Sequence, residues 1–146
     1  MRFGWEADIP RPLEEVRADL EDPQHPLRWQ PGLVRIDQRS GEPGREGAQA
    51  HHVFDLNGTS FVLTETVLVD RLPEERTTSY EGRGIRHRVT MSLRVDGPDR
   101  TILRAEHDGY LAGIHRLLAL PLRRAFRERW LVEFTALWTY LAADRR

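Results

Sequence analysis

The stretch IRHRVTMSLRV, residues 85–95, has the two-residue alternation of a β-strand that is buried on one face. The apolar phase of this stretch consists of Ile85, Val89, Met91, Leu93 and Val95. The opposite phase carries only arginine, threonine and serine. His87 falls in the apolar phase, so the sequence predicts a strand that turns one imidazole toward the core.

Short turns divide the surrounding sequence into further strands. Asn57-Gly58 is a strong signal for a two-residue hairpin turn, and residues 82–84 and 96–99 have the composition of tight turns. Consecutive strands joined by tight turns form an antiparallel sheet. The pattern predicts a first strand around 3–7, one after Pro31, and strands at about 47–56, 59–70, 76–82, 85–95 and 100–110.

Helical spacing occurs in three segments. Two short helices are predicted after the first strand, at about 12–20 and 25–30, and one long helix from about 113 to 143. Pro121 lies inside the long pattern, which predicts a kink or a restart of that helix. A lone long helix with an apolar stripe must cover one face of the sheet. The stripe comprises Leu118, Leu122, Phe126, Trp130, Leu137 and Leu141, with Phe134 and Trp138 at its edge.

The composition predicts a single globular domain over residues 1–146. The chain is 39% apolar and 31% charged with a net charge of −1, which gives no reason to expect a nucleic-acid partner. No apolar run approaches the roughly 20 residues of a membrane span. Because the first residues lack the apolar stretch of a signal peptide, we expect a cytoplasmic location. The absence of cysteine excludes disulfides and thiolate chemistry.

Several segments resemble those of the START-like (SRPBCC) superfamily, and within it the polyketide cyclase/dehydrase and lipid-transport group. They are IPRPLEEVRADLED at 9–22, RWQPGLVRID at 28–37, ETVLVDRLPEER at 65–76 and the aromatic C-terminal helix. The resemblance covers the whole chain, and its motifs mark the fold rather than a catalytic site. It implies an α+β helix-grip fold, in which a curved antiparallel sheet of about seven strands wraps around the C-terminal helix. It also implies a cavity for lipids, polyketides, sterols or other apolar molecules, with enzymatic activity in a minority of members.

Each long strand carries a strongly polar residue on its predicted core side. The turn at 57–58 places His52 diagonal to Glu65, and the turn at 82–84 pairs Tyr80 with His87. The turn at 96–99 brings His107 diagonal to His87 in the same way. We therefore predict one polar row across the concave face, consisting of His52, Glu65, Tyr80, His87 and His107.

This row has two interpretations that the residues leave open. Buried polar side chains usually have partners, so the row can be a purely structural network. Alternatively, it orients a ligand, because apolar pockets contain a few well-placed polar groups. The predicted ligand-binding residues are His52, Phe54, Glu65, Tyr80, His87, Met91, His107, Phe126, Trp130 and Phe134. Glu133 lies near the helix stripe, where it can reach either the pocket or solvent.

Three functions fit these residues. We expect a carrier or sensor of a small hydrophobic molecule. The first alternative is a polyketide cyclase/aromatase-type enzyme, with Tyr80 and His87 as donors and Glu65 or His107 as the base. The second is an interaction module whose cavity is filled by its own side chains, so a protein partner remains open.

No metal site or other cofactor is predicted. The three histidines of the row come from three strands without the tight spacing typical of metal ligands. A stripe of arginines on the opposite face is interspersed with acidic residues, which favours a solvated surface over a nucleic-acid site. The stripe consists of Arg86, Arg88, Arg94 and Arg104.

Overall fold

A computed structural model describes residues 2–111 and 119–143, except for the side chains of residues 110–111, 119–123 and 126. The chain begins with strand β1 (Arg2–Ile9), helix α1 (Leu13–Glu21) and the short 3-10 helix η1 (His25–Arg28). Six strands follow: β2 (Leu33–Ser40), β3 (Gln49–Leu56), β4 (Thr59–Arg71), β5 (Glu75–Gly82), β6 (Ile85–Val95) and β7 (Thr101–Leu111). Helix α2 (Ala119–Ala142) ends the described chain.

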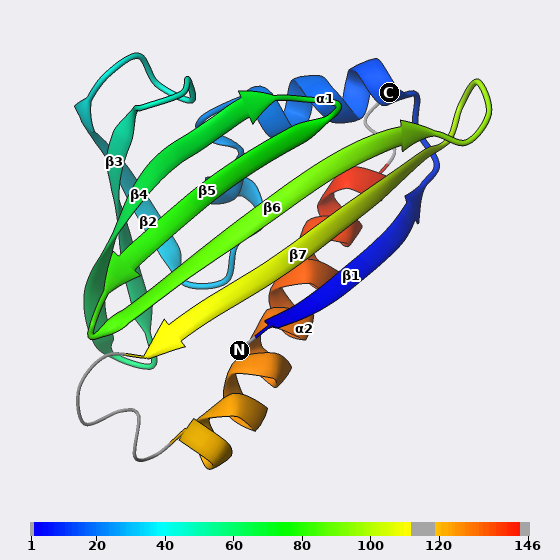
Figure 1. Ribbon diagram of the computed structural model, residues 1–146. Coiled ribbons are helices and arrows are strands. Elements are labelled where there is room, and N and C mark those ends of the chain that lie inside the picture. Colours follow the sequence, from blue (N-terminus) through cyan, green and yellow to red (C-terminus); the bar gives the residue numbers. More distant parts are fainter. Residues whose placement is uncertain (1, 112–118, 144–146) are drawn as a thin grey trace.

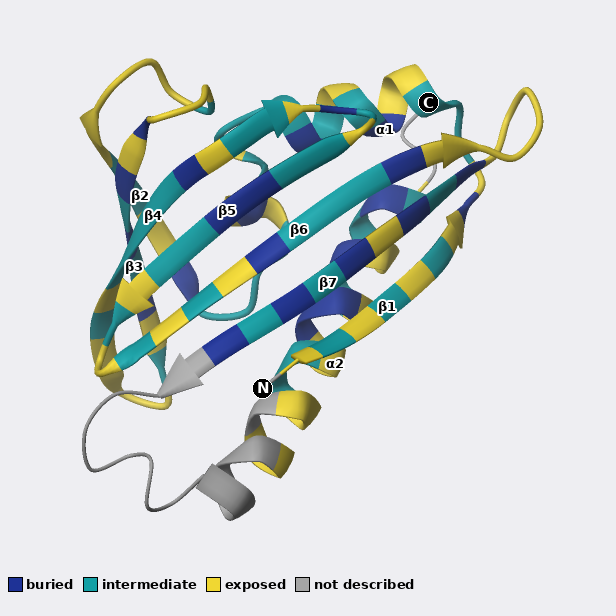
Figure 2. Ribbon diagram, viewed as in Figure 1, coloured by how far each residue is buried: buried dark blue, intermediate teal, exposed yellow. Residues whose placement is uncertain are grey.

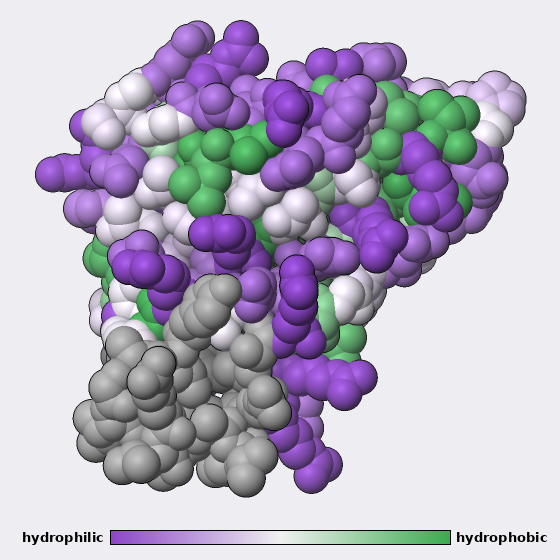
Figure 3. Space-filling view, in the orientation of Figure 1, coloured by the Kyte–Doolittle hydropathy of each residue, from purple (hydrophilic) through white to green (hydrophobic). Residues whose placement is uncertain are grey.

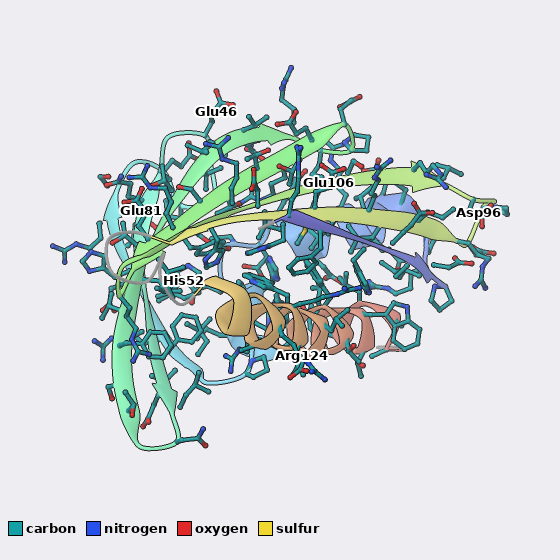
Figure 4. All side chains as sticks on the ribbon, turned by 60° about the horizontal axis from the view of Figure 1, so that its bottom comes forward. Glu46, His52, Glu81, Asp96, Glu106 and Arg124 are labelled. Carbon is teal, nitrogen blue, oxygen red and sulfur yellow. The ribbon has the colours of Figure 1, made fainter. Side chains whose placement is uncertain are left out.

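All seven strands form one antiparallel sheet in the order β1-β7-β6-β5-β4-β3-β2. The sheet curves over α2, and the β3–β4 hairpin bends down along one side of the helix (Figures 1 and 4). α1 follows directly from β1 and contacts β6, and η1 follows α1 and contacts β2. The predicted α+β helix-grip fold is confirmed.

Two hairpin turns fix the register of the central strands. Both residues of the Asn57-Gly58 turn have positive φ, at 53° and 79°, as a two-residue type I′ turn requires. Arg83 and Gly84 repeat this geometry with φ of 55° and 73°. The strand pairs that these turns predict, Ala50 with Glu65 and Tyr80 with His87, are present.

A bulge in β4 was not predicted. The register between β4 and β5 shifts between Val67 and Val69, and this shift is what brings Glu65 opposite Tyr80. A bulge adds one residue to one strand and thereby changes the pairing of every residue beyond it. The pairing of Glu65 therefore depends on a local irregularity as well as on the turn at Pro73.

The hydrophobic core lies between the sheet, α1 and the C-terminal half of α2. Every second residue of β7 from Thr101 to Gly109 is buried, Val89 and Leu93 are the buried residues of β6, and the sheet-facing side of α2 is buried (Figure 2). The core cluster consists of Ile9, Val16, Leu20, Leu72, Leu93, Leu103, Leu137 and Leu141.

The helix stripe differs from its prediction in detail. Phe134, expected at the edge, is only 2% exposed, and its ring stacks on Trp5 at 5.0 Å. Glu133 is 5% exposed and so belongs to the buried face, whereas Trp138 stays 39% exposed and donates its Nε1–H to the Asp8 carbonyl. Pro121 is the third described residue of α2, so the predicted kink or restart, which depends on the residues before Ala119, lies outside the described part of the chain. The predicted helical residues 113–118, and with them Leu118, lie outside the described part of the chain.

The outer face of the sheet is mostly hydrophilic, with scattered apolar residues (Figure 3). The four arginines of the predicted stripe are all exposed on this face, and three of them pair with acids. These pairs are Arg86 with Glu81, Arg94 with Glu6 and Arg104 with Glu106. Within the described residues, no helix has the length and apolar character needed to cross a membrane.

Candidate functional site

The five residues of the predicted polar row lie next to one another on the concave face of the sheet. His52 is on the helix side of the sheet, whereas Glu106 is on the outer side (Figure 4). The Tyr80 ring lies 5.7 Å from the His52 ring and 5.0 Å from the His87 ring, measured between centroids. The His87 ring is in turn 5.1 Å from the His107 ring. The row is therefore continuous across the five strands β3 to β7.

Glu65 is the charged centre of one half of the row. The Tyr80 hydroxyl donates a hydrogen bond of 3.2 Å to Oε2 of Glu65. Nε2 of His52 lies 3.1 Å from the same oxygen, close enough for an ion pair but outside hydrogen-bond geometry. Burial raises the pKa of Glu65, but His52, the charge of Arg76 and the Tyr80 hydroxyl outweigh it, so this pKa lies below its usual value. The carboxyl group therefore stays ionised at neutral pH.

The other half of the row consists of neutral imidazoles packed against Trp130. The Trp130 ring lies 4.0 Å from His107 and 4.8 Å from His87, measured between centroids. Burial lowers the pKa of His87 to about 4, and burial together with the neighbouring His87 lowers that of His107 to about 3. His107 is 1% exposed, and neither of its ring nitrogens has a hydrogen-bond partner among the described residues.

A cavity of about 420 Å³, here called the outer cavity, lies between the β3–β4 hairpin, the β5–β6 hairpin and α2. Phe54 and Phe61 pair across the β3–β4 hairpin, and their rings stack at 5.0 Å. His87, Arg83 and Arg129 supply polar groups to the lining. The apolar part of the wall comprises Phe54, Leu56, Phe61, Leu63, Ile85 and Trp130.

Gly82 allows the strands to approach closely at this cavity. A Cβ atom on Gly82 would lie 2.5 Å from the Val62 carbonyl oxygen and 2.8 Å from Cδ2 of Leu63. No side chain fits in that space, so the absence of one at Gly82 shapes this part of the lining.

A second space, the inner cavity, is smaller and more polar. Its volume is about 60 Å³, and it lies between η1, β4, β5 and α2. Glu65, Arg76 and His25 contribute polar groups to it. Nδ1 of His25 accepts a hydrogen bond of 2.9 Å from Nε1–H of Trp29, so the neutral ring carries its proton on Nε2. Burial, together with the charge of Arg76, lowers the pKa of His25 to about 4, which keeps the ring neutral.

The two cavities share a wall made of Gln30, Tyr80, Trp130 and Glu133. Glu133 Oε2 accepts a hydrogen bond of 3.1 Å from Gln30 Nε2, and Oε1 accepts one of 3.2 Å from Arg129 Nε. Burial raises the pKa of Glu133, while Arg129 and Gln30 partly oppose this rise. The wall thus contains a buried carboxyl group held on both sides by donors.

The structure brings most of the predicted ligand-binding residues to these cavities. Phe54 and His87 line the outer cavity, Glu65, Met91 and Phe134 line the inner one, and Tyr80 and Trp130 line both. His52 and His107 are not among the residues lining either cavity, and they lie behind Tyr80, His87 and Trp130. The side chain of Phe126 lies outside the described residues.

Other lining residues were missed by the sequence analysis. Arg76 shares the strand phase of Thr78 and Tyr80, so its inward direction was readable from the alternation. His25 is the first residue of the short helix η1, Gln30 lies just after it, and Arg83 occupies a turn. In such short or irregular segments no periodicity predicts the direction of a side chain. In the described part of the chain, no three histidine, aspartate or glutamate side chains are grouped to hold a metal ion.

The fold is shared with solved structures of low sequence identity. The di-domain ARO/CYC protein BexL of the BE-7585A biosynthetic pathway matches with a TM-score of 0.77 and 15% identity over 95% of this chain. The chain spans 45% of the length of that protein. A protein from Thermus thermophilus matches with a TM-score of 0.77 and 15% identity over 100% of both chains. A START superfamily protein from Mycobacterium smegmatis matches with a TM-score of 0.68 and 16% identity over 96% of each chain.

Sequence comparison identifies the family. A search of curated proteins gave no match. The family model for polyketide cyclase/dehydrase and lipid transport matches residues 3–139, which is nearly the whole chain. The predicted START-like resemblance is thereby confirmed, and the chain belongs to the polyketide cyclase/dehydrase and lipid transport family.

Proposed function

We propose that the protein binds a small apolar molecule in the outer cavity, as a carrier or sensor. The observation that carries this proposal is the outer cavity itself, whose volume is about 420 Å³ and whose wall is largely aromatic and aliphatic. Pockets for small molecules typically span roughly 300–1,000 Å³ and combine an apolar wall with a few polar groups. An interaction module with a filled core would leave no such space between sheet and helix.

The protonation states of the polar row favour binding over acid–base catalysis. A general acid or base works best with a pKa near the operating pH. Burial and the charge of Glu65 raise the pKa of Tyr80 well above its usual value, while burial lowers that of His87 to about 4. Neither group exchanges protons readily at neutral pH, so both suit orientation of a ligand by hydrogen bonds and ring contacts.

The proposal is tested by identifying and replacing the ligand. Molecules that co-purify with the protein are extracted and identified by mass spectrometry. The uncharged fluorescent probe N-phenyl-1-naphthylamine is then titrated into the wild type and into Trp130→Phe. We expect saturable binding at one site and quenching of tryptophan fluorescence that is much weaker in the variant, because Trp130 lines the cavity. Absence of saturable binding would refute the proposal.

A cyclase/aromatase-type enzyme is the second candidate, and the contact of Tyr80 with Glu65 favours it. In an enzyme that uses Glu65 as the base and His87 as a donor, Glu65→Gln and His87→Gln abolish turnover of the identified ligand. In a carrier, the same variants leave ligand affinity within about tenfold, because a neutral hydrogen bond contributes only about 1 kcal/mol net. Conversion of the ligand by the wild type, lost in both variants, would replace the carrier proposal with the enzyme.

A further inference from the structure

Arg83 occupies a backbone position that an arginine rarely adopts. It is the first residue of the two-residue turn between β5 and β6 and has a φ of 55°. Asparagine, aspartate or glycine is preferred at this position, because a larger side chain is unfavourable in the left-handed region. The turn would therefore form more easily without this arginine, and residues held in such conformations cluster at ligand-binding sites.

The guanidinium of Arg83 is directed to the outer cavity. Its central carbon lies 4.6 Å from the centroid of the Phe61 ring, and Phe61 in turn stacks on Phe54. A guanidinium over an aromatic face is held in place by a cation–π interaction while its N–H groups remain able to donate. Arg83 and both rings line the cavity, so the N–H donors of the guanidinium lie beside the aromatic part of the wall.

Arg83 differs from the other arginines that line the two cavities. Arg76 pairs with Asp70 at 2.9 Å, and Arg129 pairs with Glu133 at 3.2 Å. Within the described residues, Arg83 has no carboxylate within ion-pair distance. The sequence of residues 112–118 contains no aspartate or glutamate. Among the described residues, the charge of Arg83 at the cavity is therefore not neutralised by a neighbouring acid.

From these observations we infer that the ligand of the outer cavity is an apolar organic anion whose carboxylate or sulfonate group is bound by Arg83. This inference rests on the proposed function and names the chemical class of the ligand. The aromatic wall accommodates the apolar body, and the planar guanidinium matches the two oxygens of a carboxylate. The described lining of the cavity agrees with this class, because Arg129 pairs with Glu133 and the positive charge of Arg83 has no acidic partner among the described residues.

Two probes with the same aromatic body test the inference. N-phenyl-1-naphthylamine is uncharged, and 1-anilinonaphthalene-8-sulfonate is the same molecule with a sulfonate group. We expect Arg83→Gln to weaken binding of the sulfonate about fivefold, the size typical of a partly exposed ion pair, and to leave the uncharged probe within about twofold. Arg83→Lys, which keeps the charge, should restore part of the loss. Raising the salt concentration should weaken sulfonate binding to the wild type more than to Arg83→Gln, because salt screens exposed charges.

Arg94→Gln is the matched control, because it removes the same charge from the outer face of the sheet, where Arg94 pairs with Glu6. If Arg83→Gln and Arg94→Gln reduce sulfonate binding equally, Arg83 does not bind the anion and the inference is overturned. If the uncharged probe does not bind the wild type, the proposed function itself fails. If Arg83→Gln abolishes binding of both probes, Arg83 maintains the shape of the cavity instead of binding the anion, and the inference is overturned as well.

Discussion

The outer and inner cavities share one wall but differ in size and in chemistry. The outer cavity has a volume of about 420 Å³ and an aromatic wall, whereas the inner one has about 60 Å³ and contains Glu65, Arg76 and His25. A space of the inner size holds a few water molecules or one small polar group. Tyr80 and Trp130 therefore divide the concave face into two parts. One part has room for an apolar molecule, and the other contains a polar network.

The two cavities also differ in whether the polar residues around them have hydrogen-bond or ion-pair partners. Around the inner cavity, the polar groups are hydrogen-bonded to one another: Tyr80 donates to Glu65, and Arg76 donates to Asp70. Around the outer cavity, His87 packs by ring contacts and Arg83 stacks on Phe61. The inner network can therefore persist without a ligand, while the outer groups keep hydrogen-bonding capacity for one.

The loss of one aromatic ring should affect the stability of the protein more at the inner cavity than at the outer one. Phe134→Ala removes a nearly fully buried ring that stacks on Trp5, and we expect a loss of about 3–5 kcal/mol in the free energy of unfolding. Phe61→Ala removes a half-buried ring from the outer cavity and should cost only about 1–2 kcal/mol, with a marked loss of affinity for N-phenyl-1-naphthylamine. Urea unfolding and probe titration measure both quantities. Equal losses of stability would show that the outer cavity is ordinary core.

Acid should destabilise the fold, mainly through the three histidines whose pKa is lowered in the folded protein. The folded pKa values of His25, His87 and His107 are about 4, 4 and 3, whereas a histidine in the unfolded chain titrates near 6.5. Below about pH 6.5 the unfolded chain binds these protons and the folded protein does not, so stability is lost as the pH falls toward about 4.

His107→Leu makes this test more specific, because it removes one such histidine, whose two ring nitrogens have no hydrogen-bond partner in the described part of the chain. We expect the variant to be about 1 kcal/mol more stable than the wild type near neutral pH, since an unsatisfied buried polar group costs that much or more. The advantage should grow at about pH 5, where the wild type carries the penalty of a histidine that stays neutral. A less stable variant at both pH values would show that His107 has a favourable polar partner.

The Tyr80 hydroxyl connects a ring that lines both cavities to the carboxylate of Glu65. Tyr80→Phe removes the hydroxyl that donates to Glu65 but keeps the ring that lines both cavities. We expect a loss of about 1–2 kcal/mol in stability and an affinity for N-phenyl-1-naphthylamine within about twofold of the wild type. Urea unfolding and probe titration on the same preparation check this. A large loss of probe affinity would mean that the Tyr80–Glu65 pair belongs to the binding site itself.

The sequence predicted the sheet, its register and the polar row because these depend on local signals. The alternation in β6 identifies His87 as an inward residue, and the Asn57-Gly58 turn sets the pairing of β3 with β4. The bulge at Val67–Val69 carries no such signal, although the pairing of Glu65 with Tyr80 depends on it. The polar row was predicted correctly because the length of the turn between β4 and β5 is compatible with that pairing, and the bulge itself was not foreseen.

The division into two cavities was not predictable in the same way. It depends on Gln30, which follows η1, reaching Glu133 on α2 across 103 residues of sequence. No periodicity encodes such a contact between irregular and helical segments. Arg83 was missed for a related reason, because a residue in a turn belongs to neither phase of the adjoining strands. Strand alternation therefore predicts which strand residues face the site. The wall between the two cavities and the position of Arg83 depend on tertiary packing.

Filling each cavity in turn shows whether the apolar ligand binds in the outer cavity. Leu63→Trp adds bulk to the outer cavity, and Val89→Leu adds a methylene group to the inner one. Binding of N-phenyl-1-naphthylamine is measured by fluorescence titration, with urea unfolding as the check that each variant is folded. We predict that Leu63→Trp reduces affinity at least about tenfold and that Val89→Leu leaves it within about twofold. Undiminished binding in a folded Leu63→Trp variant would contradict binding of the apolar ligand in the outer cavity.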